Sequence, residues 1–377
     1  MKRISVVIGS RPQAVKLAPV ILACKHHRGI KASVCVTTRR SEVVKQVLDV
    51  FGITPDADLG LKVADRSLPA VTARAIEAMD EYLGDAKPDF VFVQSDTATT
   101  FCAALASFYR GVPVGQVEAG LRAGDAMAAF PEESFRILTS RLSTLHFAPT
   151  EHAKANLLRE HVAASRVFVT GNTAVDALMT ALEQVRKAPP PLPGLPKGVL
   201  KSWGDAPLVL ITSHGREGFG RAFESVCKAV ADLARRFEFA RFVWAVHVNP
   251  AMRRPADRYF GKDGPDNVHL IEPLPYLAFV ALLERATLVL TDSAAIQEEA
   301  PELGKPVLLM RQLTDRPEGI AAGTTKLVGT DTRTIVREAA RLIDDPDAYQ
   351  AMASVPNPYG DGKASERIFQ ATLSFLS

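Results

Sequence analysis

Short apolar segments alternate with longer helix-like segments along the first half of the chain. The apolar segments are rich in valine and end in polar residues or glycine, and they cover residues 3–10, 31–38, 89–96 and 114–120. A loop containing Pro12 follows the first of them, and the helix-like segments cover residues 15–27, 42–53, 72–83 and 98–113. This alternation predicts a parallel α/β domain whose polar strand ends lie along one edge of its sheet.

The second half of the chain repeats the pattern. Residues 131–150 suggest a helix that leads into a short strand, and residues 167–182 a strand, a turn at Gly171 and a helix. Repeated prolines make residues 188–198 a loop, because proline lacks an N–H donor and fixes φ. Strand, loop and helix return at 207–234, and further strands are expected at 241–250, 267–274, 286–290 and 305–310.

Two domains follow from this reading, at residues 1–170 and 171–360, with their strand ends facing each other across a cleft. The last helix, within residues 361–377, could pack on either domain. A length of 377 residues suits two domains, each large enough for its own core.

Residues 286–306 contain a candidate anion site. The apolar segment ATLVL runs into Thr291, Asp292 and Ser293, which are residue types that start helices. Free backbone N–H groups are therefore expected at 293–295, and such a helix start after a parallel strand favours phosphate. Glu298 and Glu299, one turn further, would repel an anion unless one of them binds sugar hydroxyls. An ordinary capped strand–helix unit is the alternative.

Composition narrows the function classes. The hydrophobic share of 47% and the charged share of 23% are ordinary for globular proteins. A net charge of +3, without blocks of like charge, disfavours nucleic acid as a partner. No apolar run approaches the roughly 18 residues that span a bilayer, which argues against membrane insertion. The cysteines form no metal-ligand or CxxC spacing, so they read as reduced packing residues of a cytoplasmic protein; they are Cys24, Cys35, Cys102 and Cys227.

Acidic and imidazole side chains gather where strands are expected to end. They are Asp96, Glu118, His214 and His247, and Glu132 and Glu133 follow Pro131 at an expected helix start. A single carboxylate at a helix start is usually a cap, whereas convergence at strand ends favours a catalytic site.

Two further segments could bind phosphate. Residues 213–221, SHGREGFGR, place glycines beside a helix start but lack the GxxxxGK[ST] pattern. Arg11 and Lys16 lie close to the first strand–helix turn and offer cations to a diphosphate, unless both are merely solvated.

Motifs along the whole chain resemble those of the bacterial non-hydrolysing UDP-N-acetylglucosamine 2-epimerases. They include GSRPQAVKLAP, SDTATT, PVGQVEAGLRAGD, FPEESFR, VTGNTAVDAL, HGREGFGRA, LTDSAAIQEEAPELGKPVL, RPEG and NPYGDG, in the family's order and spacing. The resemblance implies a GT-B-like fold of two Rossmann-type domains with the active site in the cleft. It also implies that residues 361–377 return to the N-terminal domain.

The family's reaction interconverts UDP-N-acetylglucosamine and UDP-N-acetylmannosamine through loss of UDP to a 2-acetamidoglucal and its re-addition. The resemblance implies a UDP-sugar as the partner, no metal or redox cofactor, a cytoplasmic homodimer, and a role in cell-envelope polysaccharide synthesis. A hydrolysing epimerase that releases UDP and N-acetylmannosamine is one alternative. A sugar-nucleotide-binding protein without turnover is another.

Site residues carry over from the matching motifs. Asp96, Glu118 and Glu132 resemble the family's catalytic carboxylates, and His214, also expected to be catalytic, resembles its cleft histidine near the phosphates. Glu299 matches the residue at the ribose hydroxyls, and Phe279 lies in the region that receives uracil. The full set expected to bind substrate is Arg11, Lys16, Arg136, Phe279, Ser293, Ala294, Ala295, Glu299 and Arg316.

This chain departs from the family pattern mainly at positions expected in the cleft. Gln13 replaces a glutamate, Gln94 and Ser95 replace His-Gly, bulky Phe135 replaces a small amide, and Ala294 and Ala295 replace a Gly-Gly pair. These changes leave open a closely related UDP 2-acetamido sugar as the substrate. Family members commonly bind a second UDP-N-acetylglucosamine as activator. Its positions here are Arg39, Arg40, Ser41 and Gly215, so we expect this activation to be lost or altered.

Overall fold

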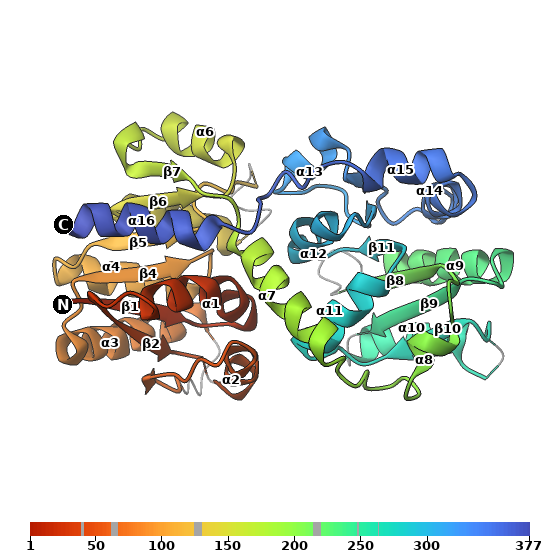
Figure 1. Cartoon of the computed structure of the whole chain (residues 1–377), viewed down its shortest axis with the longest axis horizontal. Coiled ribbons are helices and arrows are strands. Elements are labelled where there is room, and N and C mark those ends of the chain that lie inside the picture. The colour runs from red at the N-terminus through yellow and green to blue at the C-terminus, as the bar shows by residue number, and fades with distance from the viewer. Residues whose placement is uncertain (39–40, 62–66, 124–129, 214–219, 247–248, 263) are drawn as a thin grey trace. The chain divides into compact units, whose positions relative to one another are not determined.

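The computed structural model describes residues 1–38, 41–61, 67–123, 130–213, 220–246, 249–262 and 264–377. The chain divides into two compact units (Figure 1). Unit 1 comprises Met1–Met179 and Tyr359–Ser377, and unit 2 comprises Thr180–Pro358.

Unit 1 is built on a parallel sheet of seven strands in the order β3-β2-β1-β4-β5-β6-β7. Every pairing in this sheet is parallel, and β1 and β4 are the neighbours at which the strand order reverses direction. Ligands of parallel α/β sheets bind at the carboxyl ends of strands near such a reversal. The strands are β1 (Lys2–Ile8), β2 (Ile30–Val36), β3 (Ala57–Asp58), β4 (Phe90–Gln94), β5 (Val114–Val117), β6 (Leu145–Ala148) and β7 (Val167–Val169).

Six helices of unit 1 form two packing groups. Helices α3, α4 and α5 pack side by side, whereas α1 packs against α2 and against the last helix, α16 (Figure 1). The helices are α1 (Arg11–Lys25), α2 (Ser41–Val50), α3 (Leu68–Ala86), α4 (Ala98–Tyr109), α5 (Glu132–Leu142), α6 (Glu151–Arg159), the 3₁₀ turn η1 (Ala164–Arg166), the start of α7 (Thr173–Lys187) and α16 (Ala364–Leu376).

Unit 2 contains a parallel sheet of six strands in the order β10-β9-β8-β11-β12-β13. Its strands are β8 (Leu208–Ser213), β9 (Arg241–Val246), β10 (Val268–Ile271), β11 (Leu288–Thr291), β12 (Val307–Leu309) and β13 (Thr325–Leu327). Its helices are α8 (Val199–Ser202), α9 (Arg221–Arg236), α10 (Pro250–Phe260), α11 (Tyr276–Arg285), α12 (Ala294–Glu299), the 3₁₀ turn η2 (Ala300–Leu303), α13 (Pro317–Ala322), α14 (Thr332–Asp344) and α15 (Pro346–Ala353).

Successive residues of β8 point alternately into two apolar clusters on opposite faces of the unit 2 sheet. Val209 and Ile211 of β8 face a cluster that includes residues of α9 and α14. Leu208 and Leu210 of the same strand face a second cluster with α11. A strand covered on both sides needs a continuous apolar sequence, which is why these strands read as unbroken hydrophobic runs.

The predicted fold class is confirmed, since both units are parallel α/β structures with helices packed on their sheets. Three details differ. The supposed loop around Pro12 is the first turn of α1, where proline is tolerated because that N–H has no helical partner. The elements that were not predicted are β3, β13, α6, α8, α10, α11, α13, α14 and α15. The unit boundaries fall within α7, after Met179 rather than Gly171, and after Pro358.

The final segment of the chain is tied into unit 1 by buried hydrogen bonds. Asp176 accepts from the backbone N–H of Ala364 at 3.2 Å and of Ser365 at 2.8 Å. The N–H of Asn172 donates to the carbonyl of Tyr359 at 2.7 Å. Gly171 has φ +88°, and a Cβ atom there would lie 3.4 Å from the Cα of Gly360, so the crossing depends on a glycine.

All four cysteines are free and buried, which confirms them as packing residues. Burial raises the pKa of each thiol to about 12. None of the helices in the described ranges is long and apolar enough to cross a bilayer.

Candidate active site

Two strained residues mark the carboxyl ends of neighbouring strands in unit 1. Ser95 follows β4 with φ +67°, and Glu118 follows β5 with φ +60°. The left-handed region costs a residue with a Cβ atom about 1–2 kcal/mol. Such strain persists where the surroundings hold it in place, and it concentrates at functional sites.

Glu118 is buried, with 6% of its surface exposed, and its carboxylate has partners on both oxygens. Oε1 accepts from the ammonium of Lys16 and from Asn172 Nδ2 at 3.1 Å. Oε2 accepts from Gln94 Nε2. Three donors, one of them a cation, favour the ionised carboxylate.

Lys16 lies on α1 and is itself only 5% exposed. A buried charge without its partner is strongly destabilising, so Lys16 and Glu118 depend on each other. Lys16 was predicted from the sequence as a contact of the substrate. The structure shows an ion pair with Glu118, and the contact with substrate stays a prediction.

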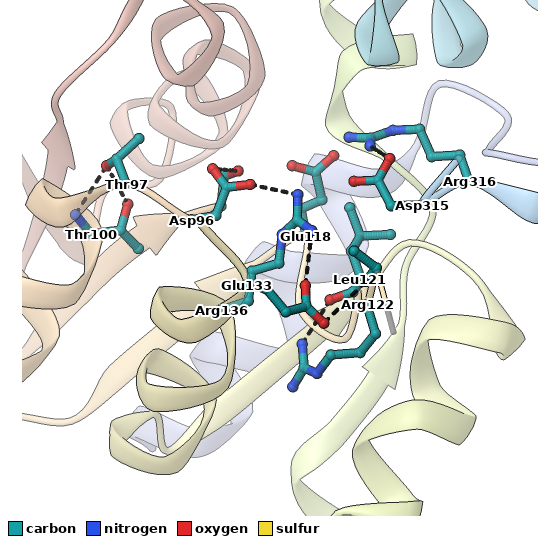
Figure 2. A network of polar contacts seen from close by, with 12 residues as sticks. Asp96, Thr97, Thr100, Glu118, Leu121, Arg122, Glu133, Arg136, Asp315 and Arg316 are labelled. Carbon is teal, nitrogen blue, oxygen red and sulfur yellow. Dashed lines mark hydrogen bonds and ion pairs between the residues drawn. The ribbon is translucent and has the colours of Figure 1, made fainter. Parts of the chain in front are cut away.

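Asp96 is held by a second network at the same sheet edge (Figure 2). Its Oδ1 atom accepts from Ser95 Oγ at 2.8 Å, and its Oδ2 atom accepts from Arg136 Nη2 at 2.6 Å. Arg136 also donates from Nη1 to Glu133 Oε2 at 3.1 Å. The buried Glu133 accepts from the backbone N–H of Ala123 at 3.0 Å, which ties the start of α5 to the segment after β5.

The start of α5 thus supplies two members of this network. Glu132 is the first residue of the helix and lies half-buried beside Glu133. Phe135 stands where the family pattern has a small amide, at a position expected in the cleft. Its ring is 8% exposed and stacks on Phe101 of α4, with the ring centres 5.5 Å apart. Phe135 therefore packs two helices together.

Gln13 joins α1 to the end of β4 and the start of α4. Its Oε1 accepts from Gly9 N at 2.7 Å, and its Nε2 donates to the carbonyl of Gln94 at 2.7 Å. The same amide nitrogen donates to Thr97 at 3.2 Å and to Thr100 at 2.7 Å. An ionised glutamate cannot donate to a carbonyl, so the amide suits this position. Arg11 opens the same helix and is half-exposed.

The anion site expected in unit 2 is smaller than predicted. Ser293 occupies the N-cap of α12, but its backbone N–H donates to Thr291 Oγ1 at 2.9 Å and is not free for a ligand. Ala294 and Ala295 begin the helix and are half-exposed. The helix ends after six residues and passes into a 3₁₀ turn. The sequence had indicated one longer helix, but Pro301 lacks the N–H that would continue it.

The remaining unit 2 candidates are buried or half-buried. Arg316 is 6% exposed, and its guanidinium pairs with Glu298 Oε1 and with Asp315 Oδ1. Its charge is therefore balanced by carboxylates of its own unit. Glu299 ends α12 with 5% of its surface exposed. Phe279 is partly buried against the apolar cluster at α11.

Several predicted residues lie outside the described ranges. They are His214, His247, Gly215, Arg39 and Arg40. Ser41 is described as the first residue of α2.

Two partners in these networks were not recognised from the sequence. Asn172 was read as part of a turn, and Glu133 was named among the acidic candidates without its arginine partner. Asn172 follows the end of β7 at the same sheet edge, so extending the strand-end rule to amides would have found it. Glu133 stood among the acidic candidates, but the sequence did not distinguish a helix cap from the partner of an arginine there.

Comparisons with known proteins agree along the whole chain. A family model described as UDP-N-acetylglucosamine 2-epimerase matches residues 22–373. The UDP-N-acetylglucosamine 2-epimerase of Escherichia coli K12 is 47% identical over 369 residues, which cover 98% of each chain. The Neisseria meningitidis UDP-GlcNAc 2-epimerase bound to UDP-GlcNAc has a TM-score of 0.90 and 42% identity, covering 99% of this chain and 100% of that one. The S. aureus MnaA–UDP co-structure has a TM-score of 0.90 and 39% identity, covering 100% and 97%.

Proposed function

The chain belongs to the UDP-N-acetylglucosamine 2-epimerase family, and we propose from this premise that it interconverts UDP-N-acetylglucosamine and UDP-N-acetylmannosamine. The observation that carries the catalytic part of the proposal is Glu118. This carboxylate is buried, held in a left-handed conformation after a parallel strand, and paired with Lys16. Full-length similarity to epimerases supports the choice of reaction.

In the proposed reaction, a base removes the proton from C2 of the sugar while the C1–O bond to UDP breaks. The C2–H electron pair forms the C1=C2 double bond of a 2-acetamidoglucal, and UDP leaves with the C1–O pair. UDP then returns to C1 as C2 takes a proton on its other face. The sugar is neither oxidised nor reduced overall, so these steps need no redox cofactor.

Three carboxylates are proposed to handle the C2 proton: Asp96, Glu118 and Glu132. Epimerisation needs an acid and a base on opposite faces of C2, and each such group contributes about 10²–10⁴-fold. Asp96 and Glu118 follow adjacent strands, and Glu132 begins α5 beside the residue that holds Arg136. This common origin supports their joint assignment.

The nucleotide is proposed to bind through cations, helix-start amides and one acidic residue. Arg11 and His214 are assigned to the diphosphate, whose departure a positive charge favours. Glu299 is assigned to the ribose hydroxyls and Phe279 to the uracil. The other proposed contacts are the side chains of Lys16, Arg136, Ser293 and Arg316 and the backbone N–H groups of Ala294 and Ala295.

Incubation with UDP-N-acetylglucosamine in D₂O tests the proposed function. We expect deuterium at C2 of both nucleotide sugars, with UDP-N-acetylmannosamine formed and little UDP released. Free N-acetylmannosamine with stoichiometric UDP would indicate a hydrolysing epimerase instead. Binding without exchange would indicate a sugar-nucleotide-binding protein. Exchange seen only with a modified UDP 2-acetamido sugar would move the proposal to that substrate.

We further propose that the enzyme acts as a cytoplasmic homodimer that supplies cell-envelope polysaccharide synthesis. Apolar side chains exposed on neighbouring helices support self-association: Phe108 is 60% exposed and Tyr109 66% at the end of α4, and Leu138 of α5 is 45% exposed. Light scattering across a concentration series tests the dimer, and a monomeric mass throughout would contradict it.

Loss or alteration of activation by UDP-N-acetylglucosamine is also proposed. It is supported by Arg39, Arg40, Ser41 and Gly215, which stand where the family pattern has its activator-binding residues. Initial rates of UDP-N-acetylmannosamine turnover should not rise when a trace of UDP-N-acetylglucosamine is added. A clear rise, or a sigmoidal rate curve, would contradict this.

A further inference from the structure

The side-chain amide of Gln94 uses its nitrogen, but not its oxygen, in a hydrogen bond within the described parts of the chain. Gln94 is the last residue of β4 and is 1% exposed. Its Nε2 atom donates to Glu118 Oε2. Its Oε1 atom is buried, and within the described parts of the chain it has no hydrogen-bond partner. A buried acceptor without a partner is uncommon in native proteins and calls for an explanation.

The main chain of Gln94 is held in place by hydrogen bonds, so only the side-chain amide can rotate. Its carbonyl accepts from Gln13 Nε2 and from Thr100 Oγ1, both at 2.7 Å. In the sheet Gln94 is paired with Val117, the residue before Glu118. The amide can therefore turn without moving the strand that carries it.

Asn172, the other amide on Glu118, is fixed at both ends. Its Nδ2 atom donates to Glu118 Oε1 at 3.1 Å, and its Oδ1 atom accepts from Ala174 N at 2.9 Å. Turning this amide would break both bonds. Lys16, on the same Glu118 oxygen, can only donate. A proton on Oε1 would thus face donors, whereas a proton on Oε2 would face Gln94.

We propose that Gln94 is a positioning residue that matches both protonation states of Glu118 by turning its amide. This inference rests on the proposed function, in which Glu118 gains and loses the proton of the sugar. While Glu118 is ionised, Gln94 Nε2 donates to Oε2. When Glu118 carries a proton on Oε2, the amide turns by half a rotation, and Oε1 accepts from that O–H. Gln94 itself neither gains nor loses a proton.

The test compares Gln94→Met with the wild type in the C2 deuterium exchange assay across pH. Methionine keeps the length but offers neither a good donor nor a good acceptor. We expect kcat for exchange to fall roughly 10- to 100-fold, with KM within about twofold. The rising limb of the pH profile should move to higher pH, because the hydrogen bond lost by the ionised carboxylate is charge-assisted and stronger than the one lost by the neutral O–H. Gln94→His should restore most of the rate, since an imidazole can present either a donor or an acceptor.

Gln116→Met is the matched control. Gln116 is an equally buried glutamine on the adjacent strand β5, and its Oε1 accepts from Ser140 Oγ at 2.9 Å. This variant should keep the pH profile of the wild type. A purely structural role for Gln94 would make both variants equally slow and leave both profiles unmoved, which would overturn the proposal.

A second variant protects the test against misfolding. If Gln94→Met does not fold, the isosteric Gln94→Glu replaces it. Two facing carboxylates then share one proton, so the rising limb should again move to higher pH. An unchanged profile would overturn the proposal. Wild-type protein without any exchange would overturn the proposed function itself, so the two failures are distinguishable.

Discussion

Arg136 Nη2 lies 2.6 Å from Asp96 Oδ2 and binds this carboxylate to the start of α5. The other terminal nitrogen of this guanidinium, Nη1, donates to Glu133 Oε2 at 3.1 Å (Figure 2). Asp96 therefore faces a cation that is itself fixed by a buried carboxylate. The orientation of Asp96 therefore depends on Glu133, which is not proposed to contact the substrate.

Replacing Glu133 by glutamine should slow C2 exchange about tenfold, because Arg136 loses the charge that fixes it behind Asp96. The amide can still accept from Ala123 N, so the unfolding free energy should fall by only about 1–2 kcal/mol. Glu160→Gln is the control, since Glu160 binds Arg122 at 2.7 and 2.8 Å in the same unit. Equal effects of both variants on exchange would exclude the positioning role.

The Lys16–Glu118 pair should show strong coupling in a double-mutant cycle. Lys16→Met and Glu118→Gln each leave one buried charge unpaired, and each should reduce the unfolding free energy by about 3–5 kcal/mol. The double variant should be no less stable than either single one. Urea unfolding measures all three. The more exposed pair of Arg122 and Glu160 is the control and should show a coupling energy of only about 1 kcal/mol. If the stability losses of Lys16→Met and Glu118→Gln are additive, the two residues do not depend on each other and the prediction is wrong.

Backbone strain at Ser95 should appear as a difference between glycine and alanine. Both substitutions remove the hydroxyl that donates to Asp96, but only glycine adopts φ +67° without strain. Ser95→Gly should therefore be more stable than Ser95→Ala by about 1 kcal/mol. Ser107 lies within helix α4 and should give the opposite order, because glycine destabilises helices. Thermal melting of the four variants measures these differences. If glycine and alanine rank in the same order of stability at Ser95 and Ser107, the backbone at Ser95 is not strained.

The free energy of unfolding should decrease at acidic pH because His146 of β6 is buried in its neutral form. Burial, with smaller contributions from the charges of Arg166 and Arg122, lowers its pKa from 6.5 to about 4. Between these values the unfolded chain binds a proton that the folded chain does not, so stability is lost as pH falls from 6.5 to 4. A shift of this size corresponds to about 3 kcal/mol.

Urea unfolding from pH 7 to pH 4 measures this loss. His146→Leu should flatten the decline by about that amount, whereas a variant of the exposed His152 should not. Identical pH dependence in the wild type and in His146→Leu would contradict the assignment.

The sequence predicted most strands well because they are short apolar runs covered on both faces, whereas β3 and β13 are Ala-Asp and Thr-Lys-Leu and carry no such run. It also placed Asp96 and Glu118 at strand ends, and the structure shows both there. Contacts between distant segments were out of reach. The bond from Asn172 to Glu118 spans 54 positions, and the bond from Arg136 to Asp96 spans 40. The stacking of Phe135 on Phe101 of the neighbouring helix was not predicted either, because the sequence does not show which ring a phenylalanine contacts.

Solvent deuterium incorporation at C2 by amide variants of the three carboxylates tests the central claim most directly. Asp96→Asn, Glu118→Gln and Glu132→Gln should each lower the exchange rate by at least about 10²-fold, because an amide cannot carry the C2 proton. Circular dichroism should show all three folded. Exchange at the wild-type rate in the three variants would contradict the account.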